Sequence, residues 1–170
     1  MNFKQPEWTR SLPTPTVMGF ATLGSIGTRF KAPGTWGSLA GLLYFWVCFS
    51  EMGILGNLLA SAIGVYFAVG FCGEAEIRLA KHDPGEVILD EFVAMPLCFL
   101  GWQWIWVSVP AWVILVVGFG LFRLYDIRKP LMINSLQELP GGWGVVMDDV
   151  AAALATCATL HVVNLLWVMI

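Results

Sequence analysis

The chain has 170 residues, of which 58% are hydrophobic and 12% are charged, and its mean hydropathy is +0.74. Soluble proteins carry roughly a quarter charged residues, so this composition excludes an ordinary soluble domain and predicts an integral membrane protein. We expect one domain over residues 1–170 with four or five crossings of about 20 apolar residues each, and the net charge of −3 says little about partners.

The first 19 residues are predicted to form a polar arm at the membrane interface. They contain three prolines, Pro6, Pro13 and Pro15, and lack the hydrophobic centre of a secretory signal. We therefore expect an arm that is not cleaved.

A glycine-rich loop, residues 24–38, runs into the first apolar stretch, residues 32–50. Its last part, KAPGTWGS, begins with Lys31 and carries the hydroxyls of Thr35 and Ser38. Backbone N–H groups and hydroxyls at the start of a helix form a site for anions. The P-loop pattern GxxxxGK[ST] is absent, and the loop alone is a weak signal.

The second apolar stretch, residues 52–73, matches a bilayer core of roughly 30 Å at about 1.5 Å per residue. A polar segment, residues 74–91, follows and ends in the acidic pair Asp90 and Glu91. Its histidine, His82, lies in the sequence KHDPG, so we expect a turn residue there rather than a proton-transfer group.

The third apolar stretch, residues 92–122, is too long for one crossing by about half. Its middle, residues 100–106, places a glycine and a glutamine among three tryptophans, which favour a membrane interface. This pattern predicts a hairpin of two helices, one beginning within residues 87–90 and ending near Leu100, the other covering about residues 104–125. Pro110 would lie in the first turns of the second helix, where its missing N–H is tolerated.

The segment FRLYDIRKP, residues 122–130, ends this second helix with charged residues. Arg123 and Asp126 lie three residues apart on one helix face, and the sequence Arg128-Lys129-Pro130 ends the helix at the interface. Arginine offers a fork for two phosphate oxygens, and lysine offers a compact charge. Attraction to anionic lipids explains Arg128 at least as well.

The last polar segment contains the glycine cluster GGWG, residues 141–144, followed by the acidic pair Asp148 and Asp149. The glycines either let the backbone pass close to a ligand or form a turn that feeds the last helix. That helix is predicted over residues 150–170, where His161 and Asn164 are expected to share an interhelical hydrogen bond.

The distribution of charge decides the number of crossings. With five crossings, all nine lysines and arginines fall on one side of the membrane, as do eleven of the twelve acids, leaving only Glu51 outside. With four, Arg123, Arg128 and Lys129 would lie opposite the other six, against the positive-inside tendency. The sequence therefore predicts an all-α membrane bundle of about five transmembrane or membrane-embedded helices, with any active site at the cytoplasmic face.

Five carboxylates are predicted at the cytoplasmic mouths of these helices: Asp90, Glu91, Asp126, Asp148 and Asp149. Each could pair with a lysine or arginine in the headgroup layer, because interfacial charges are common. Crowded carboxylates also repel one another, and a divalent cation relieves that repulsion. Ligand sets made only of oxygen favour Mg²⁺ or a similar hard ion.

The four cysteines fall in apolar stretches without a CxxC pair, and we expect them to act as small core hydrophobes. The sequence contains no internal repeat and no basic patch with interleaved aromatic residues. We therefore expect no nucleic-acid partner.

Four motifs follow one another along the chain: KAPGTWGS, LDEF (residues 89–92), FRLYDIRKP, and GGWGVVMDD (residues 141–149). In this order and spacing they resemble bacterial phosphatidylglycerophosphatase A over about residues 20–153. Enzymes of that family are Mg²⁺-dependent phosphatases that remove the terminal phosphate of phosphatidylglycerophosphate to give phosphatidylglycerol. The resemblance implies this activity, a phospholipid substrate, and a location in the bacterial cytoplasmic membrane.

The resemblance also implies roles for individual residues. The expected catalytic residues are Asp90, Glu91, Asp126, Asp148 and Asp149. Those expected to hold Mg²⁺ are Asp90, Glu91, Asp148 and Asp149. Those expected to bind the substrate phosphate are Lys31, Thr35, Ser38, Arg123 and Lys129. A metal and one or two cations would neutralise the phosphate and stabilise the leaving alkoxide, whereas the choice between an attacking aspartate and an activated water stays open.

Three other functions fit the sequence less well. A CDP-alcohol phosphotransferase needs a DGxxAR signature, and a lipid phosphatase with a histidine nucleophile needs an SGH motif; the sequence contains neither. A transporter or ion-binding membrane protein would distribute its acids through the depth of the bilayer. Residues 150–170 contain no acid at all.

Overall fold

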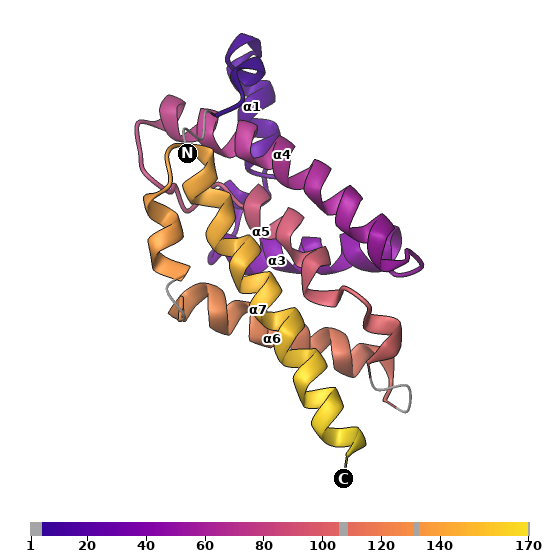
Figure 1. Ribbon diagram of the computed structural model, residues 1–170. Helices are drawn as coiled ribbons and strands as arrows, with labels where there is room; N and C mark the ends of the chain where they lie inside the picture. The colour runs from indigo at the N-terminus through magenta and orange to yellow at the C-terminus, as the bar shows by residue number, and fades with distance from the viewer. Residues whose placement is uncertain (1–4, 106–108, 131–132, 170) are drawn as a thin grey trace.

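The chain folds as a bundle of helices, shown in Figure 1 as a computed structural model that describes residues 5–105, 109–130 and 133–169. Every regular element within these ranges is helical. This confirms the all-α prediction.

The first half of the chain follows the predicted pattern. Helix α3 (Pro33–Tyr44) continues as a π-helical segment, η2 (Phe45–Phe49), and together they match the predicted stretch 32–50. Helix α4 (Ile54–Leu79) extends six residues beyond the predicted 52–73, because the charged residues of its last turns still form helix. A short helix, α2 (Ile26–Arg29), lies in the glycine-rich loop before α3.

The predicted hairpin begins as expected and then differs. Helix α5 (Leu89–Ala94) continues as the 3-10 segment η3 (Met95–Phe99), which ends next to Leu100. A further 3-10 turn, η4 (Trp102–Trp104), follows, and α6 (Ala111–Arg128) begins seven residues later than predicted. Pro110 precedes α6 in an extended conformation, with ψ 136°, instead of lying in its first turns. The end of the predicted break, Trp106, lies outside the described residues.

The last helix begins earlier than predicted. After the 3-10 segment η5 (Ile133–Glu138), α7 (Gly142–Val168) starts eight residues before position 150. Gly141 has a φ of 58°, and a Cβ at Gly142 would collide with the backbone oxygen of Val69 in α4. The glycine cluster therefore forms both the turn and a close crossing of α7 with α4.

Asp148 and Asp149 consequently lie inside a continuous helix instead of at the mouth of one. Helix α7 runs the length of the molecule and packs against α4, α5 and α6 (Figure 1). Phe45, Phe99 and Leu160, each almost fully buried, form part of the core on its inner side.

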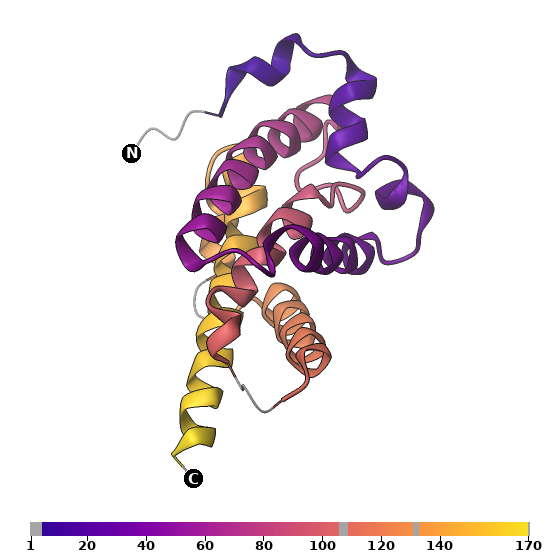
Figure 2. The same cartoon turned by 90° about the vertical axis from the view of Figure 1, so that its right-hand side faces the viewer.

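The amino-terminal arm belongs to the folded unit. Its elements η1 (Glu7–Ser11) and α1 (Thr14–Ala21) pack along α4 (Figure 2). Arg78, near the end of α4, donates hydrogen bonds to the Leu12 carbonyl at 3.0 Å and the Thr14 hydroxyl at 3.2 Å. Thr9 of η1 is fully buried and lies close to Gly70 of α4. A position at the membrane interface stays a prediction.

Two helices in the described part of the chain, α4 and α7, are long and apolar enough to cross a membrane, judged by length and composition. On α4, Leu55, Leu59 and Ile63 recur every four residues and are each more than half exposed, so an apolar stripe faces outward. Three of the four cysteines are buried thiols as predicted, whereas Cys48 is exposed.

Candidate active site

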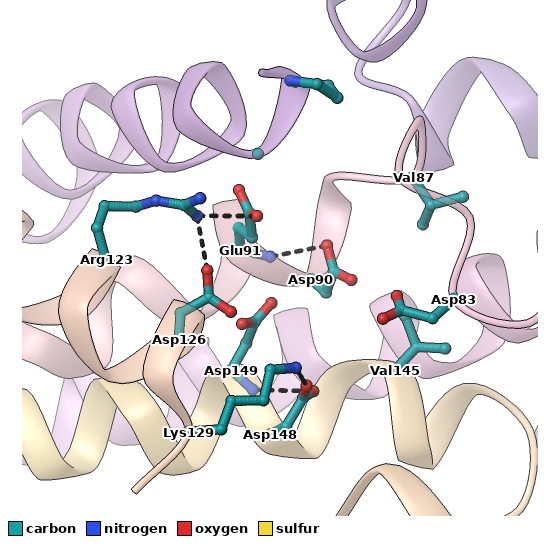
Figure 3. A pocket seen from close by; sticks show the side chains of 13 residues that line it. Asp83, Val87, Asp90, Glu91, Arg123, Asp126, Lys129, Val145, Asp148 and Asp149 are labelled. Carbon is teal, nitrogen blue, oxygen red and sulfur yellow. Dashed lines mark hydrogen bonds and ion pairs between the residues drawn. The ribbon is translucent and has the colours of Figure 1, made fainter. Parts of the chain in front are cut away.

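One cavity of about 280 Å³ lies where α5, the end of α6 and the first turns of α7 meet (Figure 3). Six carboxylates and two cationic side chains line it, a formal excess of four negative charges. The lining residues are Pro33, Gly34, Asp83, Gly85, Val87, Asp90, Glu91, Arg123, Asp126, Lys129, Val145, Asp148 and Asp149.

The two acids of α5 point in different directions. Asp90 is 5% exposed, faces the cavity, and accepts a hydrogen bond at 2.9 Å from the backbone N–H of Glu91. The carboxylate of Glu91 turns toward α3 and α6, where it meets Arg123. Adjacent acids therefore have separate environments.

Arg123 connects three helices through one nitrogen. Its Nη1 donates to Glu91 Oε1 at 3.0 Å, to Asp126 Oδ2 at 2.7 Å and to Ser38 Oγ at 3.2 Å. No described residue accepts a hydrogen bond from its Nε or Nη2. The guanidinium is therefore fixed on one side and has donors left for a ligand.

Lys129 follows the last residue of α6 with a φ of 43°, and its ammonium donates to the carboxylate of Asp148. Burial lowers the pKa of Lys129, but the hydrogen bond to Asp148 and the nearby carboxylates raise it, so the net shift is upward. Lys129 therefore stays charged beside the cavity.

Asp149 has no such partner. It is 4% exposed, its carboxylate is directed into the cavity between those of Asp126 and Asp90 (Figure 3), and no described residue donates a hydrogen bond to it. A buried carboxylate without a cation or donor is energetically costly. Asp149 therefore marks the place where the cavity most needs a positive ligand.

The KAPGTWGS segment forms the start of α3 and packs against the site from behind. A Cβ at Gly34 would collide with the Glu91 carboxylate, and a Cβ at Gly37 would lie 3.0 Å from the same carboxylate and 2.9 Å from the Ile88 Cβ. The fully buried Ser38 hydroxyl lies 3.1 Å from Glu91 Oε2 and accepts from Arg123. We call Gly34, Gly37 and Ser38 the α3 socket, because they receive the Glu91 carboxylate and the Arg123 guanidinium.

Seven of the ten predicted site residues line the cavity: Asp90, Glu91, Arg123, Asp126, Lys129, Asp148 and Asp149. Ser38 lies behind the lining and reaches the site through Glu91 and Arg123. Lys31 and Thr35 are outside the lining, and Lys31 is exposed.

The sequence analysis missed Asp83. This residue precedes Pro84 in the loop after α4 and adds the sixth carboxylate to the lining. The KHDPG sequence was the available signal, but it also predicts an ordinary turn. The exposed ring of His82 lies 2.8 Å from Glu76 Oε1 and outside the cavity lining.

The donor set of the cavity fits a hard divalent cation, because every anionic group that lines it is a carboxylate. Within the described residues, no three histidine, cysteine or acidic side chains already stand close enough to share one metal ion. The expected Mg²⁺ therefore stays a prediction.

His161 and Asn164 lie on α7, away from the cavity. The His161 ring nitrogen Nε2 is 2.7 Å from the Leu100 carbonyl, and Asn164 donates to the Trp104 carbonyl at 3.4 Å. Each residue thus bonds separately to the segment that follows η3. Leu100 lies outside any helix and Trp104 ends η4, so the two residues do not share one interhelical hydrogen bond as predicted.

Comparison with known proteins indicates the same family as the four sequence motifs. The family model described as Phosphatidylglycerophosphatase A matches residues 19–164. A Haemophilus influenzae phosphatidylglycerophosphatase A is 35% identical over 134 residues, covering 75% of this chain and 76% of the relative. The Escherichia coli phosphatidylglycerophosphatase A is 28% identical over 141 residues, covering 79% and 76%.

A third relative bears a different name. A Bacteroides thetaiotaomicron protein, named provisionally as a phosphatidylinositol-3-phosphatase, is 31% identical over 159 residues, covering 85% of this chain and 93% of the relative. No solved structure is significantly similar to this chain. The extent of the family match and of these relatives shows that the chain belongs to the phosphatidylglycerophosphatase A family.

Proposed function

We propose that this chain hydrolyses the terminal phosphomonoester of phosphatidylglycerophosphate, releasing phosphatidylglycerol and inorganic phosphate. Membership of the family supports the substrate class and the reaction. The observation that carries the proposal is one cavity in which Arg123 and Lys129 are fixed by acids while the buried carboxylates of Asp90 and Asp149 have no cationic partner. Phosphate transfer needs both cationic groups, which stabilise charge on the phosphate, and free carboxylates, which can hold a metal ion or take part in the attack.

Arg123 and Lys129 are proposed to bind the phosphate of the substrate. Glu91, Asp126 and Ser38 hold Nη1 of Arg123, so its remaining N–H groups are oriented before the substrate arrives. Lys129 is held by Asp148. Groups fixed in this way lose little freedom on binding and stabilise charge that develops on the phosphoryl oxygens.

Mg²⁺ is proposed to bind among the predicted ligands Asp90, Glu91, Asp148 and Asp149. Asp90 and Asp149 suit this role best, because Glu91 and Asp148 already pair with cations. When bound, such an ion supplies Lewis-acid stabilisation of phosphoryl and leaving oxygens. Asp90 and Asp149 would hold it.

The same two aspartates are proposed to serve the attack on phosphorus. One of them either attacks the phosphorus directly, displacing the lipid alkoxide and forming an aspartyl phosphate that water then hydrolyses, or accepts the proton of a water that attacks the phosphorus as the lipid alkoxide leaves. Acid quenching of a single turnover with substrate labelled in its terminal phosphate separates these routes. Label bound to the protein indicates direct attack, and label found only in free phosphate indicates attack by water.

The chain is proposed to cross the bacterial cytoplasmic membrane five times, with the cavity at the cytoplasmic face. The ends of α4 and α7 meet near the cavity at Gly73 and Gly142, whereas Gly101 packs against Ile54 and His161 at the far end of the bundle. This arrangement supports a turn around Gly101 on the side opposite the charged cavity.

Impermeant thiol labelling tests this topology. Single cysteines at the exposed positions Gln103 and Lys81, in a chain without the four native cysteines, should react from opposite sides of sealed membrane vesicles. Reaction of both positions from the same side would contradict five crossings.

The substrate assignment is tested by phosphate release from purified protein in detergent. We expect rapid release from phosphatidylglycerophosphate and much slower release from phosphatidylinositol 3-phosphate, the lipid class in the name of the Bacteroides relative. The opposite ranking would transfer the assignment to the inositol lipid. Metal binding without release from either lipid would favour the ion-binding alternative.

A further inference from the structure

The loop between α4 and α5 brings a sixth carboxylate to the active-site cavity. Figure 3 shows Asp83 directed into the cavity from the side opposite Arg123. Asp83 lies outside both candidate membrane-spanning helices and is exposed.

The loop is held at several points, which fixes the position of Asp83. The Asp83 backbone N–H donates to Glu76 Oε1 at 2.7 Å, and its Oδ2 accepts from Gln137 of η5 at 3.4 Å. Farther along, Val87 N–H donates to the Pro84 carbonyl at 2.8 Å, and Ile88 N–H donates to the Ala21 carbonyl at 2.9 Å. The loop is therefore tied to α4, η5 and the end of α1.

The ion pairs of the cavity divide its six carboxylates into two groups. Glu91 and Asp126 pair with Arg123, and Asp148 pairs with Lys129. The remaining lining carboxylates are Asp83, Asp90 and Asp149, and no described lysine or arginine forms an ion pair with any of them.

Within this second group, Asp149 is the residue that indicates a bound cation. Its carboxylate is buried, aimed into the cavity and without a hydrogen-bond donor among the described residues. Negative groups that surround one small cavity repel one another, and a divalent cation between them removes that repulsion. The uncompensated charge therefore lies within the cavity, between Asp126 and Asp90, and Asp83 enters the same cavity from the side opposite Arg123.

We propose that Asp83 is a metal-binding residue of this site and acts together with Asp90 and Asp149. The inference rests on the proposed Mg²⁺-dependent phosphatase function. The three residues come from the α4–α5 loop, α5 and α7, and in this structure their carboxylates do not yet stand close enough to share an ion, so a bound ion would draw these segments together. Arg123 and Lys129, each held by other acids, are then left for the phosphate.

Binding of Mn²⁺, followed by the electron paramagnetic resonance of the free ion, tests the assignment on the full-length protein in detergent. We expect Asp83→Asn to weaken Mn²⁺ binding at least about tenfold. The matched control is Glu86→Gln, a loop carboxylate that pairs with Lys81 at 3.0 Å and lies outside the cavity lining. It should bind Mn²⁺ within about twofold of the unaltered protein.

A second variant distinguishes loss of a metal ligand from a folding defect in Asp83→Asn. Asp83→Glu keeps the carboxylate and should bind Mn²⁺ more tightly than Asp83→Asn, with both variants checked by size-exclusion chromatography. The Mg²⁺ concentration for half-maximal phosphate release should rise in parallel with the loss of Mn²⁺ affinity.

Two results would overturn the assignment in distinguishable ways. Mn²⁺ binding by Asp83→Asn equal to that of the unaltered protein would remove Asp83 from the metal site, even if the variant were less active. Absence of Mn²⁺ binding in the unaltered protein, with phosphate release that a chelator leaves unchanged, would instead overturn the metal dependence of the proposed function itself.

Discussion

Arg123 orders the side of the cavity that is proposed to bind phosphate, because a single nitrogen of its guanidinium reaches acceptors on α3, α5 and α6. A lysine at this position has one ammonium on a flexible stem and cannot keep that network while also offering donors to a ligand. Arg128, five residues along the same helix, is exposed and outside the cavity lining.

We expect Arg123→Lys to lower kcat at least about tenfold, a loss of roughly 1.4 kcal/mol of transition-state stabilisation. Arg128→Lys should stay near the unaltered rate, because a charge that only attracts anionic lipid tolerates this exchange. Steady-state phosphate release checks both. Equal and mild effects would mean that the basic residues serve the membrane surface.

Ser38 and Thr35 separate two roles for the KAPGTWGS segment. If the α3 socket positions Glu91 and Arg123, Ser38→Ala should lower kcat by about tenfold, since it removes a buried partner of both groups. Thr35→Ala should change kcat less than about twofold, because Thr35 lies outside the cavity lining. Equal losses at the two positions would favour direct binding of phosphate by the loop, as the sequence predicted.

The sequence identified seven of the lining residues because short-range patterns display them, as adjacent acids or as charges three residues apart. It could not separate Ser38 from Lys31 and Thr35, since their roles depend on which face of α3 packs against α5. Asp83 was missed for the same reason: its place in the cavity depends on the path of a loop held by Glu76 and Gln137.

At the scale of elements, helix identity was easier to predict than helix boundaries. The apolar stretches predicted α3 with η2 and α4 closely, because length and composition decide such segments. The predicted start of α7 was wrong by eight residues. Gly141 to Gly144 suggested a turn, whereas three of these four residues are helical. The close approach to Val69 that requires Gly142 is a tertiary contact without a local signal.

Helix α3 packs closely on α5 through a face on which glycine leaves room for the neighbouring backbone. A Cβ at Gly41 would lie 2.8 Å from both the Phe92 carbonyl oxygen and the Met95 Cβ, and these backbone-linked atoms cannot move aside cheaply. The same helix face carries the α3 socket, so this packing also sets the position of Glu91.

Gly41→Ala should therefore destabilise the fold by about 1–3 kcal/mol. The control is Gly120→Ala on α6, where a Cβ would meet no atom within 4 Å. Because alanine favours helix over glycine, that variant should be as stable as the unaltered protein or up to about 1 kcal/mol more stable. Thermal unfolding in detergent measures both. A stable Gly41→Ala protein would show that α3 and α5 pack less closely than described here.

At the scale of the whole molecule, α4 and α7 form a frame that brings the loop after α4, the start of α5 and the end of α6 to one end of the bundle. Their apolar outer faces suit a lipid environment, and the charged cavity lies at the end where Gly73 meets Gly142. A phospholipid can then present its phosphate to the cavity while its acyl chains stay in the bilayer.

Phosphate release from phosphatidylglycerophosphate by Asp149→Asn, measured with Mg²⁺ and with a chelator, tests most directly whether the uncompensated carboxylates carry the reaction. We expect the unaltered protein to require Mg²⁺ and Asp149→Asn to lose at least about a thousandfold in kcat while it remains folded. The control Glu51→Gln changes an exposed acid that is distant from Asp149 in the sequence, and it should remain fully active. Near-normal release by Asp149→Asn, or release that the chelator does not reduce in the unaltered protein, would contradict the proposed site.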